Sequence, residues 1–167
     1  MDRDALRTLQ EPLKQHYRAE PEAALVTLTA TGTLDEEITC SVQTGRALAT
    51  AGLHPATGGD GLALCSGDML LEALVACAGV TLKAVATALE IPVTAGTITA
   101  SGVLDFRGTL AVDRDAPVGF ASIALDFDLD APGASDEQLA TLLKLTERYC
   151  VVLQTLRGAP AVAVTLA

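Results

Sequence analysis

The sequence predicts an α+β domain in which antiparallel strands and long helices occupy separate stretches of the chain. Segments with helical and with alternating patterns follow one another in the order helix, strands, long helix, strands, helix, strand. This order lacks the regular strand–helix alternation that produces a parallel sheet. The chain has 167 residues, 50% of them hydrophobic, so we expect one domain with a substantial core over residues 1–167.

The first part of the chain predicts one helix and a pair of strands. Residues 1–18 carry leucines about one helical turn apart, and Pro12 predicts a kink or a second helix start within them. Residues 24–31 and 37–42 alternate between apolar and polar side chains, which predicts two strands joined by a hairpin over residues 32–36. In this pattern Cys40 faces the core.

The middle of the chain predicts a long loop followed by a long helix. Residues 50–68 are rich in glycine, and loops of this length are often functional; His54 and Cys65 lie in it. The apolar stretch that follows predicts a helix over residues 66–90, with Asp68 in the first turn, where negative charge is favourable.

The last part of the chain predicts two strands, a helix and a closing strand. Residues 97–106 and 120–129 alternate between apolar and polar positions, most clearly in the second segment. A capping box then begins a helix that we expect to continue through Cys150 to about Leu156. The apolar residues 162–167 predict a final strand.

A helical projection places Cys77 and Cys150 on the apolar faces of their helices. Around the first of these helices the polar positions other than Thr81 form one narrow stripe that includes Asp68, and Cys77 lies opposite it. One small sheet rarely covers such a helix, so a second copy of the chain is expected to supply part of the cover. The periodicity leaves two readings open: two small core residues, or two thiols within disulfide reach.

Composition and charge exclude several classes of partner. The formal net charge is −10, the pI is about 4.4 and aromatic residues make up 3% of the chain, so we expect no nucleic-acid partner and no anionic membrane partner. We found neither an uninterrupted apolar span of membrane length nor an apolar signal region near residue 1, and we therefore expect a cytoplasmic protein.

The sequence gives no metal or cofactor motif. Cys40, His54, Cys65 and Cys77 lack the short spacings of zinc ligands, so we expect no metal. The "GGDG" stretch at residues 58–61 is not followed by a phosphate-loop lysine and matches no dinucleotide fingerprint, so we expect no cofactor.

Two segments resemble the signatures of the OsmC/Ohr family, the osmotically inducible and organic hydroperoxide resistance proteins. The stretch "HPATGGDGLALCSGDMLLEALVACAGVTL" resembles the family's glycine-rich loop and "LLxALxxC" helix, and "LTERYCVVLQTL" resembles its second signature. The similarity covers roughly residues 24–167 and leaves residues 1–20 as an N-terminal helical extension. It implies an OsmC-like fold, with antiparallel sheets around two long central helices in an intertwined homodimer.

The resemblance also implies thiol-based reduction of organic hydroperoxides. Cys77 would be the peroxidatic thiol that becomes a sulfenic acid, and Cys150 the resolving thiol that condenses with it. A dithiol reductant, of the lipoyl type in this family, would restore the pair. Apolar walls would favour fatty or aromatic hydroperoxides as the small organic substrate.

The chain departs from the family pattern in ways that resemble a divergent branch. Better-studied members place an arginine just upstream of the first helix, held by a carboxylate, whereas residues 47–67 contain no Arg or Lys here. Arg46 is the nearest, and Asp68 and Glu72 are the candidate carboxylates. The alternatives are a non-catalytic OsmC-like dimer that binds a small apolar ligand between its subunits, or a redox sensor.

In the second signature the family usually has Cys-Pro-Val-Ser, and Val151 occupies the position of that proline. Gly67 likewise replaces the proline that usually precedes the carboxylate at the start of the first helix.

Overall fold

The structure is a computed structural model that describes residues 3–34, 40–42, 52–62 and 64–166. Within it the chain forms two compact units, each built from segments far apart in sequence. One unit comprises Met1–Thr31, Gln43–Glu72 and Thr99–Asp126. The other comprises Gly32–Val42, Ala73–Ile98 and Phe127–Ala167.

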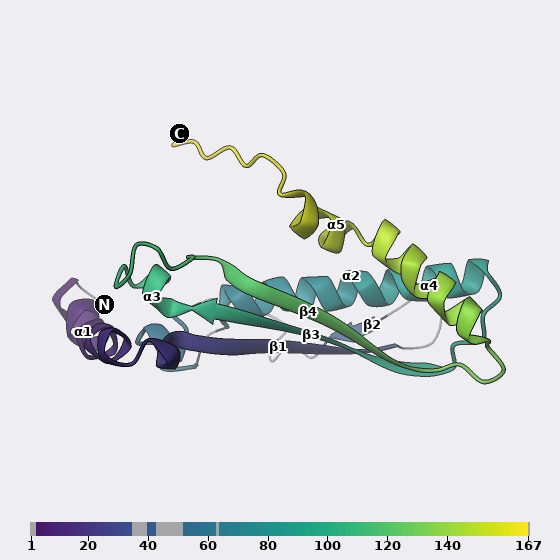
Figure 1. The fold of residues 1–167 in the computed structure, drawn as a ribbon, viewed down its shortest axis with the longest axis horizontal. Helices are drawn as coiled ribbons and strands as arrows, with labels where there is room; N and C mark the ends of the chain where they lie inside the picture. The colour runs from purple at the N-terminus through teal and green to yellow at the C-terminus, as the bar shows by residue number, and fades with distance from the viewer. Residues whose placement is uncertain (1–2, 35–39, 43–51, 63, 167) are drawn as a thin grey trace. The chain divides into compact units, whose positions relative to one another are not determined.

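Four strands form one sheet in the order β2-β1-β3-β4 (Figure 1). They are β1 (Leu25–Leu34), β2 (Cys40–Val42), β3 (Ala95–Asp105) and β4 (Phe120–Asp130). The α+β class and the antiparallel sheet predicted from the sequence are confirmed.

The first pair of strands is antiparallel, as the hairpin pattern predicts. Gly32 pairs with Val42 and Leu34 with Cys40. The link was expected to begin at Gly32, and this was wrong, because β1 continues to Leu34 and its last residues pair with β2. The side chain of Cys40 lies outside the described residues, so its inward orientation stays a prediction.

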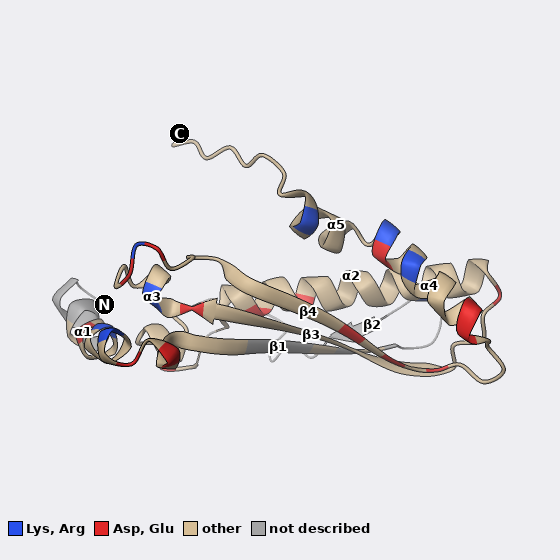
Figure 2. Ribbon diagram, viewed as in Figure 1, with Lys and Arg blue, Asp and Glu red and all other residues tan. Residues whose placement is uncertain are grey.

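The alternating pattern of the later strands corresponds to two differently covered faces. In β3, buried residues that include Ile98, Ala100 and Leu104 alternate with half-buried ones. In β4 the aspartates of the alternation, which include Asp126 and Asp128, are exposed and half-buried apolar residues lie between them (Figure 2). The strands therefore bury one face, as a period of two residues requires.

Helix α1 (Arg3–Ala19) runs through Pro12 as one helix, so the proline does not begin a second one. Its last turn buries Tyr17, whose hydroxyl donates a hydrogen bond of 2.8 Å to the carbonyl of Ala56. The side-chain amide of Gln10 donates to the carbonyl of Thr57 at 3.3 Å. Both acceptors belong to the short 3-10 helix η2 (Pro55–Thr57), so α1 holds this part of the loop in place.

Replacing Tyr17 with Phe is expected to lower the free energy of unfolding by about 1 kcal/mol, the usual net contribution of one hydrogen bond. The ring stays buried, and only the donor to Ala56 is lost. Urea unfolding monitored by circular dichroism measures the change. The matched control is Tyr149→Phe, since Tyr149 is exposed; equal stability of the two variants would contradict the role given to this hydrogen bond.

A turn held by ion pairs follows β3. Arg107, in the short helix α3 (Phe106–Thr109), donates from Nε to Oδ1 of the buried Asp105 at 3.0 Å and pairs with Asp113 at 3.3 Å. The hydrogen bonds from Arg107 lower the pKa of Asp105 against the opposing effect of burial. This turn and the 3-10 helix η1 (Pro21–Ala24), which precedes β1, were not predicted from the sequence.

The long helix predicted after the loop is α2 (Ser66–Ala88). By length and composition alone α2 could cross a membrane, but core helices of soluble proteins meet the same description. Leu71, Leu74 and Leu82 of α2 have no exposed surface. These buried leucines are what a core helix requires.

The second long helix of the prediction is interrupted. Helix α4 (Asp136–Tyr149) begins with the expected capping box of Ser135 and Gln138, and α5 (Val151–Gly158) follows it. Cys150 separates them with an extended backbone, φ −70° and ψ 106°. The expectation of one helix through Cys150 was therefore wrong. Cys150 ends α4 and is also the cap residue before the first turn of α5.

The closing strand expected over residues 162–167 is absent from the described residues 159–166, which have no regular secondary structure. Val162, Val164 and Leu166 are almost fully exposed. The apolar residues predicted a strand, but a strand forms only where a neighbouring edge accepts its hydrogen bonds.

Candidate functional site

The structure brings Cys77 and Cys150 together within one compact unit. Cys77 projects from the middle of α2 and is half-buried, while Cys150 lies at the junction of α4 and α5 with no exposed surface. The thiol of Cys150 donates a hydrogen bond to the sulfur of Cys77. Of the two arrangements that the sequence left open, this geometry is the one in which the thiols face each other.

The start of α5 faces the sulfur of Cys77. The backbone N–H groups of Val152 and Val151 interact with it. These are first-turn amides, which have no acceptor within their own helix, and the N-terminal end of a helix favours negative charge. Burial alone would raise the pKa of Cys77, but the hydrogen bonds outweigh burial, and the pKa of Cys77 lies below its ordinary value.

Thr81 adds a further donor to the same sulfur. It lies one turn after Cys77 on α2, so that residues i and i+4 share a face. Its side chain interacts with Cys77 and contributes to the lowered pKa of Cys77. In the helical projection this threonine was the one polar residue outside the polar stripe.

The two thiols differ in acidity. Burial is the largest cause that raises the pKa of Cys150, and the neighbouring Cys77 acts in the same direction; together they bring the pKa of Cys150 to about 11. Cys150 is therefore the proton donor and Cys77 the acceptor. A reactive thiolate forms first at Cys77, since the thiolate is the nucleophilic form of cysteine.

Arginines of the flanking helices are engaged elsewhere. Arg157 of α5 forms an ion pair of 3.0 Å with Glu147, and Arg148 of α4 lies over the ring of Tyr149. Among the described residues, the groups that lower the pKa of Cys77 are uncharged. Arg46, the nearest arginine before the loop, lies outside the described residues.

The other candidate residues from the sequence that the structure describes do not interact with the Cys77–Cys150 pair. His54 and Cys65 line a cavity whose lining includes neither Cys77 nor Cys150. Burial raises the pKa of Asp68, and the electrostatic interaction with His54 opposes this rise to a smaller extent. Neither Asp68 nor Glu72 is among the groups that act on Cys77.

The different acidities predict selective alkylation. Iodoacetamide reacts with thiolates, so its rate at Cys77 should rise with pH as the lowered pKa of Cys77 is passed. Cys150 should stay protonated until pH approaches about 11. Mass spectrometry of peptides after brief labelling at pH 7 to 9 measures both. Faster labelling of Cys150 than of Cys77 in this range would contradict the assigned roles.

Sequence reasoning missed the donors that surround Cys77. The amides of α5 could not be found while one helix was expected to run through Cys150, because they would then have had partners within that helix. A signal was nevertheless present: the family signature usually has a proline where this chain has Val151. Proline favours the first position of a helix, so that position already indicated a helix start.

Comparisons with known proteins agree with the fold. A family model described as OsmC-like protein matches residues 58–165. Comparison with curated protein sequences gave no significant match.

Two solved structures are similar to the chain at low sequence identity. An OsmC-like hydroperoxide resistance protein from Jannaschia sp. CCS1 is 21% identical, with a TM-score of 0.58 over 84% of this chain and 91% of that one. An OsmC-like protein from Mycoplasma pneumoniae is 18% identical, with a TM-score of 0.56 over 80% of this chain and 86% of that one.

Proposed function

Since the chain belongs to the OsmC-like protein family, we propose that it reduces organic hydroperoxides with Cys77 and Cys150, using a dithiol as the reductant. The observation that carries this proposal is the pairing of two thiols of unequal acidity. The pKa of Cys77 is lowered by hydrogen bonds, and the adjacent Cys150 remains protonated. The name of the similar protein from Jannaschia sp. CCS1 also includes hydroperoxide resistance.

The first step consumes the peroxide. The thiolate of Cys77 attacks the outer oxygen of the hydroperoxide, the O–O bond breaks, and the organic part leaves as an alcohol after taking up a proton. Cys77 is thereby oxidised to a sulfenic acid. The amides of Val151 and Val152 stabilise the negative charge on sulfur before the attack.

The second step uses the partner thiol. The sulfur of Cys150 attacks the sulfenic sulfur of Cys77, an S–S bond forms, and the sulfenic oxygen leaves as water with the proton of Cys150. An external dithiol then reduces the disulfide by thiol–disulfide exchange and is itself oxidised. A reaction that ends with two free thiols suits a reducing compartment such as the cytoplasm.

The proposed assembly is a homodimer in which a second copy covers apolar surface. Val80 on α2 and Tyr149 and Val151 next to the thiol pair are exposed in the single chain. The unpaired C-terminal residues Val162 and Val164 have the alternation of a strand without a neighbour. Covering these side chains would also exclude water from the thiols and favour apolar hydroperoxides over hydrogen peroxide.

The experiment is a steady-state assay with cumene hydroperoxide as substrate and dihydrolipoamide as reductant, with loss of peroxide followed over time. We expect many turnovers per chain, and faster consumption of cumene hydroperoxide than of hydrogen peroxide. Formation of the disulfide without sustained turnover would instead indicate a redox sensor. No reaction of either thiol at neutral pH would favour a non-catalytic member of the family.

Replacing Thr81 with Val should slow the reaction of Cys77 roughly three- to tenfold at pH 7, because the thiolate loses one hydrogen-bond donor. The pKa of Cys77 should rise, and the rate at high pH should change little. The control on the same helix is Thr87→Val, since the hydroxyl of Thr87 donates to the carbonyl of Lys83 and is exposed. Stopped-flow rates from pH 5 to 10 measure the profile, and identical profiles for the two variants would contradict the role of Thr81.

A further inference from the structure

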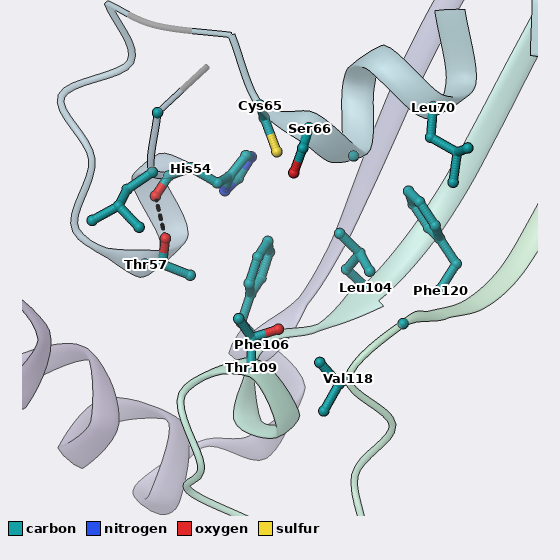
Figure 3. Close-up of a pocket in the computed structure, with 14 residues that line it drawn as sticks. His54, Thr57, Cys65, Ser66, Leu70, Leu104, Phe106, Thr109, Val118 and Phe120 are labelled. Carbon is teal, nitrogen blue, oxygen red and sulfur yellow. Dashed lines mark hydrogen bonds between the residues drawn. The ribbon is translucent and has the colours of Figure 1, made fainter. Parts of the chain in front are cut away.

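A cavity of about 420 Å³ lies in the unit that contains α1 and the start of α2, and its lining includes neither Cys77 nor Cys150 (Figure 3). This volume is in the usual range for small-molecule sites. We propose that the cavity binds a small uncharged molecule with an apolar body and one hydrogen-bond-accepting oxygen. This site is separate from the thiol chemistry and does not depend on it.

The body of such a ligand would contact an apolar wall from three parts of the chain. Leu70 comes from α2, Leu104 and Phe106 from the end of β3 and the start of α3, and Phe120 from the start of β4 (Figure 3). Leu104 and Phe106 are buried, whereas Val118 at the rim is about two-thirds exposed. A closed apolar base and an open rim allow entry and favour transfer of apolar groups from water.

The opposite end of the cavity carries a hydrogen-bond donor. Nδ1 of His54 accepts the backbone N–H of Ala56 at 3.0 Å, so the neutral ring carries its proton on Nε2. The ring is held in place by stacking on Phe106, with centroids 4.9 Å apart and planes 15° apart. In Figure 3 it projects toward Cys65 and Ser66, and the hydroxyl of Ser66 can also donate.

The charges around this end favour a neutral oxygen over a carboxylate. Asp68 lies in the first turn of α2 and interacts electrostatically with His54. An anionic head group at His54 would be repelled by this carboxylate, and the chain as a whole has a net charge of −10. A carbonyl or ether oxygen would accept the Nε2 proton without that penalty.

The wall that carries His54 is held in place by contacts with helix α1. Helix α1 fixes this wall through Tyr17 and Gln10. Gly59 closes it, because a Cβ there would lie 1.7 Å from the carbonyl oxygen of Leu53. The described part of this wall is therefore held by hydrogen bonds from α1 and by close backbone packing at Gly59.

The test is titration of the full chain with acetophenone, followed by amide chemical shifts in two-dimensional NMR. We expect saturable binding with shifts centred on residues 52–57, 104–106 and 118–120. Ethylbenzene, which has the same ring and no oxygen, should bind roughly tenfold more weakly because it makes no hydrogen bond. Absence of saturable acetophenone binding, or equal affinity for ethylbenzene, would overturn the proposal.

Three variants locate the site. His54→Asn keeps an acceptor for the N–H of Ala56 but removes the ring, and it should weaken acetophenone binding roughly tenfold. Val118→Trp fills the rim and should abolish binding, whereas Leu62→Trp, at an exposed position outside the cavity lining, should not. Cys77→Ser should leave the affinity unchanged. Full affinity in Val118→Trp, or its loss in Cys77→Ser, would place the ligand elsewhere.

Discussion

Replacing Cys77 with Ser is expected to reduce dithiol-dependent consumption of cumene hydroperoxide to the rate without protein. Serine is nearly isosteric, but its hydroxyl is far less acidic than a thiol and forms no sulfenic acid. The donors that lower the pKa of Cys77, from the start of α5 and from Thr81, would remain in place without a thiolate to stabilise. Loss of peroxide in the presence of dihydrolipoamide measures the effect.

The matched control for this variant is Cys65→Ser. Cys65 is also a free, partly exposed cysteine. It lines the cavity that contains His54 and is not part of the thiol pair. We expect it to retain the activity of the unmodified protein. If Cys65→Ser lost activity while Cys77→Ser kept it, the nucleophile would have been assigned to the wrong thiol.

Replacing Cys150 with Ser is expected to separate the two steps of the reaction. Cys77 should still react with one equivalent of cumene hydroperoxide per chain, because its amide donors from Val151 and Val152 are backbone groups that the substitution leaves in place. The sulfenic acid should then persist, since its resolving thiol is absent, and it should be trapped by dimedone. Sustained turnover should be lost.

Two measurements distinguish the outcomes for Cys150→Ser. Mass spectrometry after dimedone treatment detects the adduct on Cys77, and the steady-state assay with dihydrolipoamide detects turnover. Turnover at the unmodified rate would show that the external dithiol reduces the sulfenic acid directly. Cys150 would then have no resolving role.

The long elements of the fold were predictable because their patterns are local. The apolar alternation of β4 and the continuous apolar stretch of α2 depend on neighbouring residues only, and both elements lie where the pattern indicated. The capping box at Ser135 likewise fixed the start of α4. The class of fold follows from the order of these elements.

The errors occur where the outcome depends on contacts outside the segment. Residues 162–166 are mostly apolar, as in a strand, but composition cannot supply the neighbouring edge that a strand requires. At Cys150 the helical pattern of apolar residues continues on both sides, so periodicity did not show the extended backbone between α4 and α5. The periodicity of apolar side chains indicates which face of a helix is buried. It does not indicate where the helix is interrupted.

The candidate site was predictable in its thiols and not in their environment. Cys77 and Cys150 were identified from their apolar faces and from the resemblance to the family. Only charged side chains could be named from the sequence as candidate activating groups. The groups that lower the pKa of Cys77 are backbone amides and one threonine. Backbone amides can be identified as donors only from a structure that shows the start of α5 next to Cys77 on α2.

The most direct test of the central claim is the identity of the bond formed when the reduced protein meets one equivalent of cumene hydroperoxide. Peptide mapping by mass spectrometry under non-reducing conditions, after the remaining thiols are blocked, gives the answer. We predict a disulfide that joins Cys77 to Cys150, with Cys65 recovered as a blocked thiol. A disulfide that contains Cys65, or over-oxidation of Cys77 without any disulfide, would contradict the proposed mechanism.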